Sequence, residues 1–284
     1  MSSLLINART LISKPGMLFL YGKWLFLRKL FDKNPKLFCS NNSAISQWLN
    51  FSEYWSFSRG IPEAEKLLMQ NCLHDSLHKK TVAIDIGANI GLFAVTLASL
   101  GYSEVHVFEP IPQTFKRLQD NIKSNNFPGK INLNCLALGS QTQKLEFQVF
   151  EHSPAINRFI NCQDENNKNI VTQKVAVTTL TKYCQENNID HVDFLKIDVE
   201  GMEFFVLKGA KELLQEHRID KILLEICPIN LQSANVKLQD LYECIIESKY
   251  LPYSLKNNGN PGKILEIEDL EKVTLENIVL VPNR

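Results

Sequence analysis

The chain has 284 residues, 44% of them hydrophobic, and a formal net charge of zero. This composition is that of a globular protein and argues against disorder, and the zero net charge gives no electrostatic case for a nucleic-acid partner. The seven cysteines are odd in number, widely spaced and never arranged as C-x-x-C. We therefore expect reduced thiols in a cytoplasmic protein rather than a disulfide framework or a cysteine zinc site.

The sequence predicts an N-terminal arm over residues 1–60 and one domain over residues 61–284. Within residues 1–36, seven lysines and arginines stand against a single acid, Asp32. Residues 17–33 are the most apolar stretch, but Lys23 interrupts them, they are too short to cross a bilayer, and no small-residue cleavage site follows. On a helical wheel they form an amphipathic pattern with a basic face and with Trp24 on the apolar face. Two interpretations stay open, namely peripheral contact with a membrane surface and packing of this helix on the domain.

The second half of the arm carries an aromatic cluster formed by Phe51, Tyr54, Trp55 and Phe57. These rings could line a substrate pocket, in which a sugar would stack on Trp55, or they could belong to the core. After them, Pro62 and two early acids predict a helix over residues 62–73.

Residues 81–100 predict a buried strand, a glycine-bearing turn and a helix, the unit that opens a nucleotide-binding α/β domain. The turn contains Asp85, Gly87, Asn89 and Gly91, and its glycine spacing differs from that of a dinucleotide-binding fingerprint. An acid at the strand end would repel a phosphate, whereas it suits an ammonium or sulfonium group. S-adenosylmethionine has both groups and is therefore the predicted ligand.

A second acid, Glu109, ends the next apolar run, residues 105–108. At the carboxyl end of a second strand its carboxylate can accept hydrogen bonds from two ribose hydroxyl groups. Either acid alone could be a solvated loop residue, but two acids at successive strand ends favour a ligand site.

The middle of the chain predicts a crossover helix over residues 113–125 and a third strand over residues 131–138. Residues 144–150 alternate in hydrophobicity and are expected to pair with residues 174–177. The polar stretch between them, residues 151–170, is long enough to suggest a lid on the substrate side, with His152 and Arg158 as candidate contacts.

Residues 192–201 predict a fourth parallel strand that runs into a turn and lies beside the first strand, where ligands bind in doubly wound sheets. This adjacency places Asp198 and Glu200 near the cofactor, with Lys196 one pleat earlier on the same side. The next predicted elements are a helix over residues 204–214 and a fifth strand over residues 219–226. Glu225, near the end of this strand, would face the substrate side or anchor the following loop. A helix over residues 238–248 precedes a closing antiparallel pair, residues 250–255 and 273–281.

Four sequence motifs, beginning at Asp85, Phe108, Ala137 and Leu195, together resemble the FkbM family of S-adenosylmethionine-dependent methyltransferases. They read DIGANIG, FEP, ALG and LKIDVEGME, and the last is the most specific. The resemblance covers residues 61–282. It implies a class I methyltransferase fold, α/β and Rossmann-like, with a seven-stranded, mostly parallel sheet and helices on both faces. It also implies that Ala137 and Leu138 lie beside the adenine base of the cofactor, and that the acceptor is a hydroxyl of a sugar, glycan or polyketide-like small molecule.

Methyl transfer to an alcohol needs a group that removes the hydroxyl proton, and Asp198 or Glu200 is placed to act as this general base. The same acids could instead orient the turn, bind the cofactor amino group or cap the next helix. With Glu203 they could also bind a divalent magnesium or manganese ion, although no metal is predicted, and no neighbouring histidine favours zinc. Two other functions are alternatives to this one: a non-catalytic module that docks on a membrane or partner, and a nicotinamide oxidoreductase, which the glycine spacing disfavours.

Overall fold

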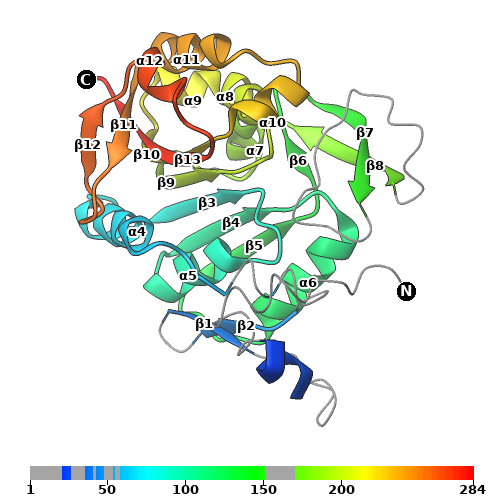
Figure 1. Ribbon diagram of the computed structural model, residues 1–284. Coiled ribbons are helices and arrows are strands. Elements are labelled where there is room, and N and C mark those ends of the chain that lie inside the picture. Colours follow the sequence, from blue (N-terminus) through cyan, green and yellow to red (C-terminus); the bar gives the residue numbers. More distant parts are fainter. Residues whose placement is uncertain (1–20, 27–35, 41–42, 48–53, 55–57, 151–169) are drawn as a thin grey trace.

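A single large sheet forms the centre of the molecule (Figure 1), as seen in a computed structural model that describes residues 21–26, 36–40, 43–47, 54, 58–150 and 170–284. Its eight strands lie in the order β12-β11-β13-β10-β9-β3-β4-β5. The strands are β3 (Val82–Ile86), β4 (Glu104–Phe108), β5 (Lys130–Asn134), β9 (Val192–Ile197), β10 (Ile219–Ile226), β11 (Tyr250–Leu255), β12 (Pro261–Ile264) and β13 (Glu276–Pro282). The expected seven strands are therefore present, and the four-residue strand β12 adds an eighth at one edge.

The order of the strands reverses between β3 and β9, which places a ligand-binding position there. From β3 the chain moves outward through β4 to β5, and it then returns to form β9 and β10 on the other side of β3. These five strands are parallel, while β13 runs antiparallel between β10 and β11. Ile86 pairs with Ile197, so the carboxyl ends of β3 and β9 lie side by side, as the sequence predicted.

Helices cover both faces of the sheet (Figure 1). One face carries α4 (Glu63–Asp75), α5 (Leu92–Leu100) and α6 (Pro112–Lys123). The other carries α7 (Leu180–Glu186), α8 (Glu203–Gly209), α9 (Lys211–Gln215), α10 (Pro228–Ser233), α11 (Leu238–Glu247) and α12 (Ile267–Leu270). Because β3 is covered on both sides, Ile84 packs into one core and Ala83 into the other, which explains the nearly continuous apolar run of this strand.

The predicted third strand is shorter than expected. Strand β5 ends at Asn134, and Ala137–Leu138 forms β6, which belongs to a separate three-stranded sheet of order β6-β8-β7. The side chain of Asn134 bonds back to the carbonyls of Val107 and Asn132, and the chain leaves the main sheet after this residue. The small sheet contains the predicted antiparallel pair, since β7 (Gln143–Phe150) pairs with β8 (Ile170–Thr178).

The predicted helix over residues 204–214 is divided at Ala210 into α8 and α9. The break follows Gly209, which lies directly against the backbone of Gly139, where a Cβ atom would come 2.0 Å from the carbonyl oxygen. The close approach joins α8 to the end of β6 and so fixes the small sheet against the main domain.

The described part of the arm packs on the domain. Strands β1 (Leu37–Ser40) and β2 (Ser43–Ile45) form a hairpin against α5, and the side chain of Asn121 on α6 accepts hydrogen bonds from the N–H groups of Ser46 and Gln47 at 2.9 and 3.1 Å. Tyr54 is 2% exposed and lies in the same core as α4 and α5. Tyr54 therefore belongs to the core, one of the two roles considered for the aromatic cluster.

Several predictions fall on residues that the structure does not describe. Phe51, Trp55 and Phe57 are among them, as are His152 and Arg158 in residues 151–169 and most of residues 17–33. Residues 21–26 are helical, and Tyr21 and Trp24 are partly buried against the core that contains α4 and α5. Within the described ranges, no helix has both the length and the apolar character needed to span a bilayer.

Candidate active site

The turn between β3 and α5 packs directly against the backbone at the end of β9. Gly87 has φ +81°, and a Cβ atom on it would lie 1.8 Å from the carbonyl oxygen of Asp198. The N–H groups of Gly87 and Ala88 donate to the carbonyl of Phe108 at 3.0 and 2.9 Å. Only glycine fits at position 87, because both its φ value and its contact with β9 exclude a side chain.

Gly91 has a different role from Gly87. It precedes α5 with φ +98°, and a Cβ atom there would lie 2.6 Å from the side chain of Leu118 on α6. Gly91 therefore sets the approach of two helices and does not line the cavity described below.

Asp85, at the end of β3, is fully buried. Neither of its carboxylate oxygens has a hydrogen-bond partner of normal geometry among the described residues, although the N–H of Ala94 lies near enough to favour the charged form. Burial raises the pKa of Asp85 to about 6, while the charge of Lys196 acts in the opposite direction. A buried carboxylate without a partner is costly in a folded protein and indicates a position where a ligand supplies the missing donors.

Glu109, at the end of β4, is held in a fixed orientation by the glycine turn. One carboxylate oxygen accepts the N–H of Asn89 at 3.1 Å and the other accepts the N–H of Ile111 at 2.9 Å. Asn89 has φ +51°, which turns its N–H toward this carboxylate. Burial raises the pKa of Glu109 to about 7 despite these two hydrogen bonds. Each oxygen keeps a further lone pair for a ligand hydroxyl.

At the end of β9, the buried Lys196 forms an ion pair with the partly exposed Asp198. The ammonium nitrogen lies 2.7 Å from Asp198 Oδ2 and 4.4 Å from the centre of the Phe93 ring. Burial alone would lower the pKa of Lys196, but the charges of Asp198 and Asp85 outweigh it and raise this pKa. The lysine therefore stays protonated between two carboxylates.

Three acids converge beyond this ion pair. One oxygen each from Asp198, Glu200 and Glu225 lies within 4.8 Å of the others. Glu200 has φ +55° and accepts a hydrogen bond from the side-chain amide of Asn230 at 2.6 Å. Burial and the neighbouring carboxylates raise the pKa of Glu200 to about 7 and that of Glu225 to about 9.

Glu203 does not join this cluster, contrary to the acid set considered for a magnesium or manganese ion. One of its oxygens accepts the N–H groups of Val199 and Gly201 at 3.1 and 3.2 Å, so it closes the turn before α8. Its place is taken by Glu225 from β10, which the sequence suggested only as a residue facing the substrate side.

A cavity of about 480 Å³ connects these groups. Of the nine residues predicted to bind cofactor or to catalyse, all but Gly91 line it, including Ala137 and Leu138 of β6. The apolar walls could not be predicted from the sequence, and they include Phe93, Leu145, Phe147, Met202 and Phe205. The alternation of β7 located Leu145 and Phe147 on one face of a strand, but nothing in that pattern showed that the strand borders the site.

The fold and the carboxyl-end acids define a Rossmann-like α/β protein of the class I methyltransferase type. Residues 85–270 match the family described as the methyltransferase FkbM domain, and the chain belongs to this family.

Two curated relatives are methyltransferases by name. The chain is 29% identical to Methyltransferase 1 of Beauveria bassiana over 51% of its own length and 64% of that protein, so the match spans less than two thirds of this relative. It is also 29% identical to the hexuronic acid methyltransferase AglP of Haloferax volcanii, over 67% of the chain and 70% of that protein.

Among solved structures, an S-adenosylmethionine-dependent methyltransferase from Agrobacterium tumefaciens superposes with a TM-score of 0.41 at 11% identity. The superposition covers 79% of this chain and 63% of that one. At this level of similarity nothing about the function of this chain follows from it.

Proposed function

We propose that the protein transfers a methyl group from S-adenosylmethionine to a hydroxyl group of an uncharged small molecule of the sugar class. The observation that carries the proposal is the pair of buried acids, Asp85 and Glu109, which share one cavity with the cluster of Asp198, Glu200 and Glu225.

The residues at the ends of β3 and β4 fit this cofactor. Asp85 offers two buried oxygens that have no hydrogen-bond partner of normal geometry in the described part of the chain and that suit the positively charged part of S-adenosylmethionine. Glu109 offers oriented oxygens for the ribose hydroxyls. The side-chain oxygen of Asn89 is also buried without a partner among the described residues. Ala137 and Leu138 would flank the base. When bound, the cofactor would supply an electrophilic methyl group, whose bond to sulfur breaks as its bond to the acceptor oxygen forms, with a neutral thioether as the leaving group.

Glu200 is the better candidate for the general base that takes the hydroxyl proton. Asp198 already accepts a charged hydrogen bond from Lys196 at 2.7 Å, whereas Glu200 bears only the neutral amide of Asn230. A pKa of about 7 also matches a base that works near neutral pH. Glu225, whose pKa is raised to about 9, keeps its proton at neutral pH and can donate a hydrogen bond to the acceptor or to Glu200.

The charges that line the cavity favour an uncharged acceptor. Among the described lining residues, five are acids and one is a cation, Lys196, which is already paired. An anionic acceptor would meet this negative field without a free counter-charge. The apolar walls formed by Phe93, Met202 and Phe205 suit the hydrophobic face of a sugar ring. The name of the Haloferax relative supports the sugar class, while the charge balance favours a neutral sugar over a uronic acid.

We also propose that residues 61–284 form the catalytic unit and that residues 1–60 are an arm attached to it. The packing of Tyr21 and Trp24 against the core favours contact of this arm with the domain over contact with lipid. Co-sedimentation of the full chain with anionic vesicles, lost on deletion of residues 1–35, would instead support membrane contact.

The test begins with isothermal titration of the full chain with S-adenosylmethionine and with its demethylated product, each with and without magnesium. Micromolar binding of both is expected. The loaded protein is then offered neutral sugars and the matching uronic acids while the demethylated product is measured. Product formed with neutral sugars supports the proposal. Absence of cofactor binding in both conditions overturns it, and turnover of uronic acids alone overturns the charge argument.

A further inference from the structure

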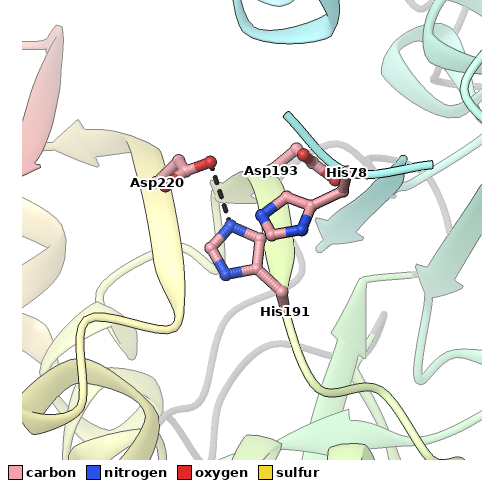
Figure 2. Close-up of side chains that lie close together, drawn as sticks. All are labelled: His78, His191, Asp193 and Asp220. Carbon is pink, nitrogen blue, oxygen red and sulfur yellow. Dashed lines mark ion pairs between the residues drawn. The ribbon is translucent and has the colours of Figure 1, made fainter. Parts of the chain in front are cut away.

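A second group of metal-ligating side chains lies at the opposite end of the same strands. It comprises His78 in the segment before β3, His191 just before β9, Asp193 within β9 and Asp220 near the start of β10 (Figure 2). One ligand atom from each residue lies within 4.8 Å of the others.

This histidine–aspartate cluster is separate from the cavity that holds Asp85 and Glu200. Its members stand at the amino ends of parallel strands, whereas the cavity lies at their carboxyl ends. A strand of six residues, such as β9, spans roughly 20 Å at about 3.3 Å a residue. None of the four residues borders the cavity.

An ion pair already brings one nitrogen of His191 next to one oxygen of Asp220. His191 Nε2 lies 2.9 Å from Asp220 Oδ2, yet this buried nitrogen makes no aligned hydrogen bond within the part of the chain that the structure describes. Ligand atoms around a tetrahedral zinc ion, each about 2.0 Å from the metal, lie about 3.3 Å apart. His191 Nε2 and Asp220 Oδ2 are closer than this, at an ion-pair distance, so zinc would take the place of the imidazole proton between them.

His78 brings a second imidazole to the same place. Its ring centre lies 4.0 Å from that of His191, and the two planes are tilted by 34° (Figure 2). Two imidazoles this close repel each other when both are protonated, whereas neutral rings can share a cation. His78 is exposed, so water-borne metal can reach it.

Asp193 anchors the segment that carries His78. It is 1% exposed, and its oxygens accept the N–H of Val82 at 2.6 Å and the hydroxyl of Ser76, two residues before His78. A carboxylate has about four lone-pair positions, so Asp193 can still provide one to an ion.

The described lysine and arginine side chains near Asp220 do not contact its Oδ2 atom, the oxygen that would bind the ion. Arg284 contacts Oδ1 at 3.4 Å, while Oδ2 faces His191. Lys221, the next residue of β10, is paired with Asp75 at 3.3 Å.

We propose that His78, His191 and Asp220 bind a zinc-class divalent ion, with Asp193 as the fourth ligand. Two imidazole nitrogens with carboxylate oxygens suit zinc, whereas magnesium and calcium select sites made of oxygen alone. The ion would join the segment before β3 to the starts of β9 and β10 and thereby stabilise the edge of the sheet opposite the cavity.

The test uses the full chain, freed of metal with a chelator and titrated with zinc chloride by calorimetry, with magnesium chloride as a specificity arm. His78→Ala and His191→Ala remove one imidazole each. His74→Ala is the matched control, because His74 is an exposed histidine four residues from His78 and lies outside the cluster. Cobalt chloride provides a second readout, since tetrahedral cobalt absorbs visible light strongly.

The expected result is one zinc equivalent with a micromolar or lower dissociation constant, weakened at least tenfold in H78A and H191A and unchanged in H74A. Zinc should raise the melting temperature of the wild type and of H74A but not that of H78A or H191A. The proposal is overturned if no equivalent binds, if magnesium binds as well as zinc, or if H78A and H191A bind zinc as H74A does. Far-ultraviolet circular dichroism reports folding of each variant, and if H191A fails to fold, the comparison of H78A with H74A decides, because His78 is exposed.

Discussion

Asp85 on β3 lies directly opposite Lys196 on β9, but the ammonium of Lys196 bonds to Asp198 at 2.7 Å, which leaves Asp85 without a hydrogen bond of normal geometry among the described residues. The positive charge of Lys196 thus offsets the negative charges of both acids, although its ammonium group bonds to only one of them, Asp198. This arrangement holds a carboxylate at the end of β3 ready for a charged ligand, and it links the proposed cofactor site to the proposed base site through a single side chain.

Replacing Glu109 should weaken cofactor binding without loss of the fold. In Glu109→Gln the side chain keeps its size but loses the charge and one acceptor, so affinity for S-adenosylmethionine should fall by about 10- to 100-fold, as expected for lost hydrogen bonds to a charged group. Calorimetry measures this, with Glu146→Gln as control because Glu146 is 63% exposed. Unchanged affinity in E109Q would show that Glu109 does not bind the ribose.

Substitution of Gly87 should destabilise the protein much more than substitution of another glycine with positive φ. Gly87→Ala combines backbone strain with a Cβ atom 1.8 Å from the carbonyl of Asp198, whereas Gly101 has φ +104° and open space around it. Gly101→Ala should therefore cost about 1–2 kcal/mol, and G87A at least about 2 kcal/mol more. Urea unfolding compares the two variants. Equal losses would mean that the contact with β9 relaxes easily.

The pH dependence of methyl transfer should report Glu200. A general base works only when deprotonated, so kcat at saturating cofactor should rise with pH through about 7, the pKa of Glu200. Glu200→Gln should lower kcat by about 10²- to 10⁴-fold and abolish this limb. Asn230→Ala removes the hydrogen bond that lowers this pKa, so the limb should move to higher pH. If E200Q keeps its rate while Asp198→Asn loses it, Asp198 is the base.

Removal of one acid from the cluster should stabilise the protein, in a pH-dependent way. Burial raises the pKa of Glu225 from 4.5 to about 9, so between these values the folded state holds a proton that the unfolded state releases. The free energy of unfolding therefore falls as pH rises above about 4.5. Glu225→Gln, which carries no such proton, should be more stable than the wild type by about 1–3 kcal/mol at pH 7 and equal to it near pH 4.

Urea unfolding at several pH values measures this difference. Glu247→Gln is the control because Glu247 is exposed on α11. A constant offset between E225Q and the wild type at every pH would contradict the linkage, since only a proton taken up on folding makes the difference depend on pH.

The sequence alone predicted the first strand, the glycine turn that follows it and the acids at two strand ends. The run at residues 82–86 was predicted to be a covered strand because its apolar side chains fall on both faces and leave no polar side for solvent. All five residues are buried in the structure. The glycines at positions 87 and 91 indicated a tight turn, and the acids at positions 85 and 109 marked two strand ends. The resemblance of four short motifs then gave the family, which the match over residues 85–270 confirms.

What the tertiary structure decided is which distant segments meet. The sequence grouped Glu203 with Asp198 and Glu200, because they are close in the chain, but the Glu203 carboxylate accepts hydrogen bonds in the turn before α8 and Glu225 arrives from β10. Likewise, Ala137 and Leu138 left the main sheet, and His78, His191 and Asp220 met across three segments that share no motif. Local patterns specify strands and turns through backbone geometry, whereas the partners of a buried charge depend on strand order and register, which only the folded chain defines.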